Sequence, residues 1–474
     1  MSTKRISKVA VIGSGIMGSG IACHFANIGV EVLLLDIAPN ELTEKENAKG
    51  LKLSDPAVRN RIVNVNLLQA IKSNPAPLYH KDFKKRIQTG NLSDDITQIT
   101  DVDWIIEVVV ERLDIKQTVF KQIEAHRTPG TLITSNTSGI PIAKMNEGRS
   151  DDFQKHFAVT HFFNPPRYLK LFEVIPGPNC LPEVSSFLLD YGSTFLGKRS
   201  VLAKDTPAFI GNRIGIFCIQ SLFHQVKNMG LTVEEIDKLT GPVIGRPKSA
   251  TFRTVDVVGL DTLVHVANGL HENCKDDERR DVFKLPDFIS TMMKKQWLGS
   301  KSGQGFYKKI KNEKGKSEIL TLDLEKLEYR TKKRAQFDTL EKIKAIDNLI
   351  ERYPVLVSGA DKASAFYRKN FGELFAYIQH RVPEISDEIY RIDDAMKAGF
   401  GWTHGPFELW DAVGLETGIE LIKEGGHKPA EWVIAMAKGS HQRFYGLDDS
   451  QQFFYDIPNK NMNVIPGHSS FIIL

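Results

Sequence analysis

The segment AVTHFFNPPRYLKLFEVI carries two side chains that are candidates for acid–base chemistry. His161 ends a strand-like run, and the Asn-Pro-Pro sequence that follows it forces a turn. A second strand-like run then brings Glu173 back beside the first. Histidine titrates near neutral pH, so His161 suits the role of a proton acceptor, and Glu173 would fix its tautomer and stabilise its charged form.

Ser138 and Asn212 are candidates to donate hydrogen bonds to a reacting oxygen without ionising. Ser138 ends the run TLITSNTS, and Asn212 lies within DTPAFIGNRIG. Hydroxyl and amide donors can stabilise charge that develops on a carbonyl oxygen. Each residue also has a structural explanation, because serine often closes a turn and asparagine often caps a helix.

The N-terminal segment has the order strand, glycine turn, helix, strand around GSGIMG. In a dinucleotide site these glycines permit the tight turn, the approach of the pyrophosphate and close packing of helix on strand. The turn residues expected at the cofactor are Gly13, Gly15, Ile16, Met17 and Gly18. Asp36 ends the second strand, where it would bind the adenosine ribose and repel a 2′-phosphate. No Arg follows it directly, so the pattern predicts NAD rather than NADP.

Two further apolar strands are predicted over residues 103–111 and 131–138, with an amphipathic helix between them. This alternation is typical of a parallel sheet with right-handed crossovers. In such sheets the ligand lies beyond the carboxyl ends of the strands. Glu111 and Asn136 fall at those ends, so we expect them near the nicotinamide.

The composition excludes several classes of protein. The 474 residues carry 62 basic and 58 acidic side chains, a net charge of only +4 without a basic block, so no nucleic-acid partner is predicted. The four cysteines show no metal-ligand spacing, so no metal site is predicted, and they indicate reduced thiols. The absence of a signal-peptide core and of any long apolar stretch predicts a cytoplasmic protein without a membrane span.

Six segments, in this order and spacing, resemble the L-3-hydroxyacyl-CoA dehydrogenase family: GSGIMG, EVVVERLDIK, SNTS, HFFNPP with LFEVI, DTPAFIGNRI and SGQGFYKK. The resemblance extends over nearly the whole chain. It implies that His161 is the catalytic base and Glu173 its orienting acid, and that Ser138 and Asn212 polarise the substrate. The implied reaction is the NAD-dependent oxidation of an L-3-hydroxyacyl-CoA to the 3-ketoacyl-CoA, a step of fatty-acid β-oxidation.

The resemblance also implies a role for two charged residues, and the segment between the second and third predicted strands is unusually long. Glu111 and Lys116 match family positions that contact cofactor and substrate. Residues 40–95 exceed the length of a simple crossover and predict a helical insertion, a turn at 74–77 and a second helix. This insertion is either a solvated excursion or a basic arm that reaches the coenzyme A tail.

Two other functions are compatible with the same residues. A related dehydrogenase could act on a free hydroxy acid or sugar acid with the same His/Glu pair. A non-catalytic NAD-binding structural protein could retain the fold alone, because fold does not establish activity. Joint retention of His161, Glu173, Ser138 and Asn212 favours an enzyme.

An internal repeat organises the second half of the chain. Residues 236–262 resemble residues 392–417 with a single one-residue gap, which predicts two all-α helical domains after a doubly wound Rossmann-type α/β domain. The tandem copies could pair within the chain and imitate a dimer, and the second, without a His/Glu pair, should be structural. The predicted domains are an NAD-binding domain over 1–204 with its insertion near 40–95, a first helical domain over 205–311, a charged linker over 312–335, a second helical domain over 336–440 and a C-terminal tail or linker over 441–474.

The C-terminal sequence raises one further expectation. Dehydrogenases with tandem helical domains often continue into an enoyl-CoA hydratase domain, and SSFIIL is an unusual ending. The chain is therefore expected to be a fragment of, or a partner to, a hydratase-containing protein, with no hydratase activity of its own.

Overall fold

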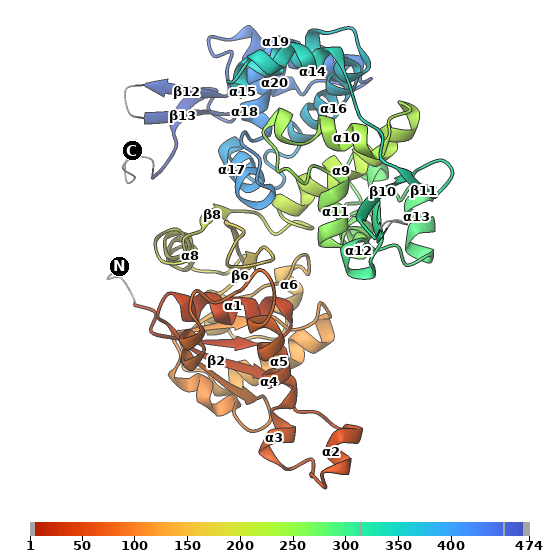
Figure 1. Cartoon of the computed structure of the whole chain (residues 1–474). Helices are drawn as coiled ribbons and strands as arrows, with labels where there is room; N and C mark the ends of the chain where they lie inside the picture. Colours follow the sequence, from red (N-terminus) through yellow and green to blue (C-terminus); the bar gives the residue numbers. More distant parts are fainter. Residues whose placement is uncertain (1–4, 312–314, 449–450, 468–474) are drawn as a thin grey trace. The chain divides into compact units, whose positions relative to one another are not determined.

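The computed structural model describes residues 5–311, 315–448 and 451–467. It divides into two compact units, Met1–Phe209 and Ile210–Leu474 (Figure 1). The first unit combines a large sheet with helices, and the second consists mostly of helices with two small sheets. The ending SSFIIL lies outside the described residues.

The first unit is built on one eight-stranded sheet with the order β3-β2-β1-β4-β5-β6-β7-β8. All neighbours pair in parallel except β6 and β7, which are antiparallel. The predicted Rossmann-type sheet is therefore confirmed. Its strands are β1 (Lys8–Ile12), β2 (Glu31–Asp36), β3 (Ile87–Asn91), β4 (Trp104–Glu107), β5 (Leu132–Ser135), β6 (Phe157–Phe162), β7 (Leu171–Pro176) and β8 (Arg199–Leu202).

Helices pack on both faces of this sheet, which explains why its central strands are continuously apolar. On one face Trp104 of β4 contacts Phe25 and Tyr191 edge-on, at 5.3 and 5.8 Å between ring centroids. On the other, Phe120 contacts Phe157 of β6 at 5.3 Å. The helices of the unit are α1 (Ile16–Asn27), α2 (Glu44–Ala48), α3 (Pro56–Arg59), α4 (Arg61–Ile71), η1 (Lys81–Arg86), η2 (Ile96–Asp101), α5 (Leu113–His126), α6 (Ile142–Met145), α7 (Asp151–Lys155) and α8 (Pro182–Thr194).

Three local predictions in this unit need correction. The strands expected over 103–111 and 131–138 are only four residues long, β4 and β5, because the chain turns away to build polar loops at the sheet edge. The insertion is helical as expected, but the second helix after the turn is the short η1. Residues 87–91 of this region form β3, which pairs with β2 and extends the sheet.

The second unit contains the predicted repeat, and the repeat proves longer than the sequence pattern indicated. Five helices of the first copy have counterparts in the same order in the second, and each copy ends in a three-stranded antiparallel sheet. The first copy comprises α9 (Gly211–Asn228), α10 (Val233–Leu239), η3 (Pro242–Ile244), α11 (Phe252–Val258), α12 (Leu260–Asn273), η4 (Arg280–Phe283), α13 (Asp287–Lys294), η5 (Ser300–Ser302), β9 (Tyr307–Lys311), β10 (Ser317–Asp323) and β11 (Glu328–Thr331). After α14 (Asp338–Lys342), η6 (Ile343–Ala345) and α15 (Leu349–Ser358), the second comprises α16 (Lys362–Ile378), α17 (Ile389–Phe400), α18 (Pro406–Val413), α19 (Leu415–Glu424), α20 (Glu431–Lys438), β12 (Tyr445–Asp448), β13 (Gln451–Asp456) and β14 (Asn461–Val464).

Aspartates at matching positions make the same hydrogen bonds in both copies. Asp237 accepts bonds from the amide of Phe252 at 2.7 Å and from the Tyr307 hydroxyl at 2.7 Å. In the second copy Asp393 accepts from Phe407 at 2.9 Å and from the Tyr445 hydroxyl at 2.9 Å. Asp256 and Asp411 likewise each accept two backbone amides from the Phe-Tyr pair that precedes the small sheet: Phe306 with Tyr307 and Phe444 with Tyr445.

The small sheets replace the linker and tail expected from the sequence. Residues 312–335 include β10 and β11, and residues 441–474 include β12, β13 and β14, so the description of both domains as all-α was incomplete. Arg330 of β11 pairs with the buried carboxylate of Glu234 at 2.6 Å, which fixes this sheet against α10. The domain boundaries proposed within the second unit stay a prediction.

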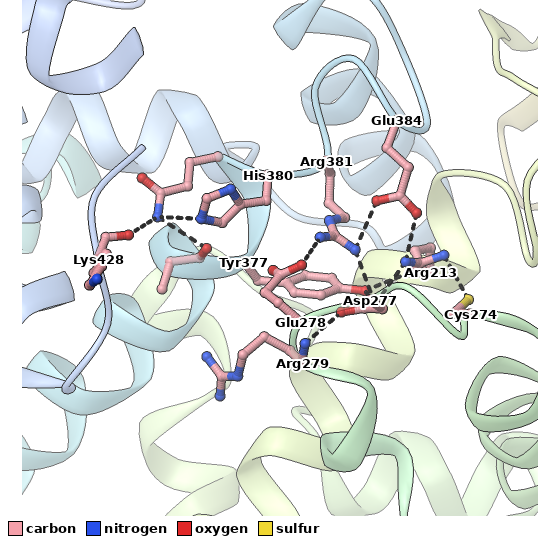
Figure 2. Close-up of polar contacts among 12 residues, drawn as sticks. Arg213, Cys274, Asp277, Glu278, Arg279, Tyr377, His380, Arg381, Glu384 and Lys428 are labelled. Carbon is pink, nitrogen blue, oxygen red and sulfur yellow. Dashed lines mark hydrogen bonds and ion pairs between the residues drawn. The ribbon is translucent and has the colours of Figure 1, made fainter. Parts of the chain in front are cut away.

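A buried charged network joins the two copies (Figure 2). Arg213 of α9 is fully buried and lies 2.7 Å from Asp277 of its own copy and 2.8 Å from Glu384 of the other. Its Nε donates to the Tyr377 hydroxyl at 2.6 Å, and the Tyr377 ring stacks on Phe217 at 3.6 Å between centroids. The two copies therefore pack on each other within one chain, as the repeat hypothesis required.

Candidate active site

The hairpin β6–β7 brings His161 and Glu173 together. The two residues are direct cross-strand partners, and His161 Nδ1 lies 2.7 Å from a carboxylate oxygen of Glu173. Glu173 is fully buried and His161 is 6% exposed, with the rings of Phe163 and Phe209 packed edge-on at 4.9 and 5.5 Å. The predicted pair therefore exists in the structure, held by strand register and by aromatic neighbours.

This contact determines what the imidazole can do. A carboxylate only accepts hydrogen bonds when ionised, so His161 Nδ1 carries the hydrogen that is donated to Glu173. In the neutral ring Nε2 then keeps its lone pair and can take a proton. Glu173 would stabilise the imidazolium that forms, which is the role of the acid in such pairs.

The glycine turn after β1 has the geometry of a dinucleotide loop. Gly13 adopts φ 100°, and a Cβ there would lie 2.6 Å from the carbonyl oxygen of Val108. A side chain is excluded at Gly13 because the backbone that follows β4 lies directly beside it. A Cβ at Gly15, by contrast, would meet no atom within 4 Å, so this backbone is open to a ligand. Gly15 also begins α1 without a side-chain cap, which leaves the N-terminal turn available to a phosphate.

Asp36 lies at the end of β2, beside this turn. Its carboxylate accepts hydrogen bonds from the amide and hydroxyl of Ser14, at 2.6 and 2.5 Å, and from the amide of Ile37 at 2.7 Å. Ile16 and Ile37 expose 78% and 61% of their surface at the same edge. Exposed aliphatic side chains beside a half-buried carboxylate suit a ligand with a flat ring and a sugar, so the residues present fit NAD.

Glu111 and Lys116 belong to a second charged cluster at the carboxyl ends of β4 and β5. Lys116 is almost fully buried and lies 2.8 Å from Glu107 and 3.4 Å from Glu111. Glu111 also accepts bonds from the Thr137 hydroxyl at 2.5 Å and the Ser138 amide at 2.9 Å. Burial tends to raise the pKa of Glu111, but Lys116 and these donors outweigh it and hold that pKa below its ordinary value.

The loop after β5 connects this cluster to the strand of the histidine. The Asn136 side-chain oxygen accepts the amide of Phe162, next to His161, at 2.9 Å. Two residues later, the Ser138 hydroxyl lies 3.4 Å from Glu111. Ser138, Asn136 and Glu111 thus gather at the sheet edge expected to hold the nicotinamide.

Two participants were missed by the sequence analysis. Glu107 is fully buried and binds Lys116 and the Ser135 hydroxyl, the latter at 2.5 Å, and Thr137 binds Glu111. Both stand in segments already recognised, EVVVE and SNTS, at the carboxyl ends of predicted strands. Asn212 lies in the first turn of α9, in the second unit, and is half-buried.

Other kinds of site find little support in the part of the chain that is described. No group of three His, Cys, Asp or Glu side chains there has the arrangement of a metal site. The four cysteines are free thiols, and burial raises the pKa of Cys218 to about 11. Over the same residues, no helix combines the length and apolar character needed to cross a membrane.

Comparison with known proteins addresses the origin of this site. Residues 8–206 match the family model described as 3-hydroxyacyl-CoA dehydrogenase, NAD binding domain. The model for the C-terminal domain of the same family matches residues 209–309 and again 372–445. The chain belongs to the 3-hydroxyacyl-CoA dehydrogenase family. The double match of the C-terminal model in this family member agrees with the internal repeat.

Individual relatives in the 3-hydroxyacyl-CoA dehydrogenase family extend the comparison. A probable 3-hydroxyacyl-CoA dehydrogenase of Bacillus subtilis is 45% identical over 96% of this chain, which spans 57% of that relative. One of Deinococcus radiodurans is 42% identical over 67% of this chain and 87% of the relative. The crystal structure of 3-hydroxybutyryl-CoA dehydrogenase from Escherichia coli shares the fold, with a TM-score of 0.64 at 21% identity, covering 92% of this chain and 98% of that one.

Proposed function

We propose that this chain oxidises the 3-hydroxyl group of L-3-hydroxyacyl-CoA thioesters with NAD, as a step of fatty-acid β-oxidation. The observation that carries the proposal is the buried contact of 2.7 Å between His161 Nδ1 and Glu173 at the edge of an NAD-binding sheet. Bound NAD would supply the hydride acceptor. Family membership and the names of the relatives support the substrate class.

Each site residue would have a separate role in the reaction. His161 Nε2 takes the proton of the substrate hydroxyl while C3 loses its hydrogen as hydride, and the C–O single bond becomes a ketone. Glu173 holds the ring and stabilises its positive charge. Ser138 and Asn212 would donate hydrogen bonds to substrate oxygens, and Glu111 and Lys116 would position cofactor and substrate.

Two wider assignments belong to the same proposal. Putative trifunctional enzymes of the fatty acid oxidation complex in Rickettsia are 30–32% identical, and this chain spans 54–55% of their length. These names favour an enoyl-CoA hydratase domain as a fusion or partner of the protein. The free thiols favour a cytoplasmic location.

A direct assay tests the activity. Acetoacetyl-CoA and NADH are added to the full chain, and the loss of absorbance at 340 nm is followed. Free hydroxy acids and sugar acids are already in the reduced state, so they are tested in the opposite direction, with NAD and a gain of absorbance at 340 nm. We expect turnover with the CoA ester and none with these acids, whereas the reverse preference would assign the protein to the rival class of dehydrogenase.

A variant tests the chemistry separately from binding. His161→Ala should lower kcat by about 10²–10⁴-fold, the usual contribution of a general base. NADH affinity, followed by fluorescence, should stay within twofold of wild type. Unchanged turnover would exclude His161 as the base, and the absence of turnover in the wild-type chain despite NADH binding would favour a structural role.

A further inference from the structure

A large basic cavity lies in the second unit, and its lining includes none of the residues assigned to the candidate active site. It measures about 1100 Å³ and is bounded by α10, the segment around η3, η5 and the small sheet β9–β11. Eight cationic side chains line it against two carboxylates. Six of these cations carry the argument: Lys238, Arg253, Lys309, Lys332, Lys333 and Arg334.

The cations of the cavity form no close ion pairs. Within the described residues, none of the eight has a carboxylate oxygen within 4.0 Å of its charged nitrogen. The two carboxylates are already engaged, since Glu234 binds Arg330 and the amide of Lys333, and Asp237 binds backbone amides and Tyr307. The whole chain carries a net charge of only +4, so this cavity concentrates positive charge. Glu341 lies close enough to Arg334 and Lys238 to interact with them, but its ion pair is with Lys344.

The internal repeat has acidic residues at the positions of two of these cations. The amide of Arg253 donates to Asp237 at 3.1 Å, and in the second copy the amide of Glu408 donates to Asp393 at 2.8 Å. Arg253 and Glu408 therefore occupy equivalent places. The residue after each aspartate is likewise Lys238 in one copy and Asp394 in the other.

The cavity wall also offers apolar surface beside the charges. Ile319 of β10 is 53% exposed, and Pro242 and Val243 of the η3 segment line the same space. Unneutralised cations beside apolar side chains, in a cavity of this volume, match a ligand with phosphates at one end and a flat ring at the other.

We propose that this cavity binds a nucleotide bearing two or more phosphates, with the phosphates on Lys238, Arg253 and the 332–334 cations and the base against Ile319. The site is separate from the NAD site of the first unit. It is also independent of the dehydrogenase activity proposed above. Free adenine nucleotides and the adenosine diphosphate end of coenzyme A share the required chemistry.

The second copy supplies the test variant. Lys238→Asp with Arg253→Glu introduces the residues that the other repeat carries at these places. In that copy Lys397 pairs with both acids, whereas the first copy has Gly241 at the matching position, so the thermal unfolding curve of the variant is recorded as a check of its fold. Calorimetric titration of the full chain with ADP, at low salt and with NADH saturating the first unit, should show a Kd raised at least tenfold in this variant. Lys294→Asp with Lys423→Glu changes the charge by the same amount at exposed positions outside the cavity, and its Kd should stay within twofold of wild type.

The outcomes separate the alternatives. Three results would each overturn the proposal. The wild-type chain could fail to bind ADP, both double variants could weaken binding equally, or the Lys238/Arg253 variant could bind ADP as tightly as wild type. A short single-stranded RNA that binds much more tightly than ADP and displaces it would also overturn the proposal, because the cavity would then be an RNA-binding site. Tighter binding of 3′-phospho-ADP than of ADP would identify coenzyme A as the source, and equal binding a free nucleotide. NADH-linked turnover of the same variants reports on the proposed function separately.

Discussion

In the proposed mechanism, the carboxylate of Glu173 affects the reaction only through the ring of His161. Glu173 is fully buried in β7, and its carboxylate lies 2.7 Å from Nδ1 of the ring. The substrate proton would go to Nε2, on the opposite side of the ring, so Glu173 is not the group that takes it. Its effects are to fix the tautomer and to favour the charged ring. Those two effects can be separated by experiment, because orientation affects rate at every pH and charge affects the pH dependence.

Glu173→Gln should lower kcat by about 10²-fold or more, because an amide can hold the ring but cannot compensate its positive charge. The acid limb of the kcat/KM profile should move to lower pH, since the imidazolium loses its stabilising partner. Steady-state rates of oxidation of an L-3-hydroxyacyl-CoA with NAD between pH 5 and 9, the direction in which the imidazole acts as the base, measure both effects. Glu183→Gln, on an exposed position of α8, is the control and should behave like wild type. A uniform loss of rate with an unmoved acid limb would mean that Glu173 contributes packing alone.

The residues that could be predicted at the site are those with a local signature. His161 and Glu173 stand on either side of an Asn-Pro-Pro turn, and Gly13 and Asp36 mark a strand–turn–helix–strand unit. Glu107 could not be found in this way, because a buried acid inside an apolar strand is recognisable only from its partner. That partner, Lys116, is nine residues away in the sequence and meets it because α5 returns over the sheet.

At the scale of elements, apolar periodicity predicted the central strands and the helices, whose partners are close in sequence. It did not predict the two small sheets or β3. Strand β9 reads Tyr-Lys-Lys-Ile-Lys and β13 reads Gln-Gln-Phe-Phe-Tyr-Asp, which are polar enough to suggest a linker. These strands are stabilised by residues far away in the sequence, which apolar periodicity does not reveal. For example, the amides of Phe444 and Tyr445 donate hydrogen bonds to the distant Asp411.

Asp411 makes this support dependent on pH. Burial raises its pKa to about 6, although the amides of Phe444 and Tyr445 oppose the shift. The folded pKa lies above the unfolded value near 3.9, so the folded state binds more protons between these values. The stabilisation is full below the unfolded pKa and is lost as pH rises through 6.

Asp411→Asn removes this titration while keeping a side-chain oxygen. Between pH 5 and pH 7 the wild-type chain should lose about 1 kcal/mol of unfolding free energy relative to the variant. Urea titrations at the two pH values measure the difference. Asp448→Asn, exposed on β12, should leave the pH dependence unchanged. An advantage of wild type that grows from pH 5 to pH 7 would show that the amides favour the ionised carboxylate instead.

At the scale of the second unit, the packing of its two copies has a consequence for assembly. Helix α9 buries one face against α16 and α17, where Phe217 stacks on Tyr377 and Arg213 binds Glu384. This face of the first copy is therefore covered by the second copy of the same chain. A dimer through α9 would have to displace an aromatic stack and a buried ion network, both of which are costly to break.

Arg213→Met tests whether this network holds the copies together. Removing the guanidinium leaves Asp277 without one of its two arginine partners, Arg213 and Arg381, and should cost about 3–5 kcal/mol of stability. Light scattering after size-exclusion chromatography should give the mass of one chain for wild type. In the variant a concentration-dependent dimer is expected, because the weakened second copy exposes the α9 face to another molecule. Arg443→Met, at an exposed position, should remain monomeric and as stable as wild type. The opposite result would be a wild-type dimer that Arg213→Met converts to monomers. It would place Arg213 at a contact between two chains and would contradict the pairing of the two copies within one chain.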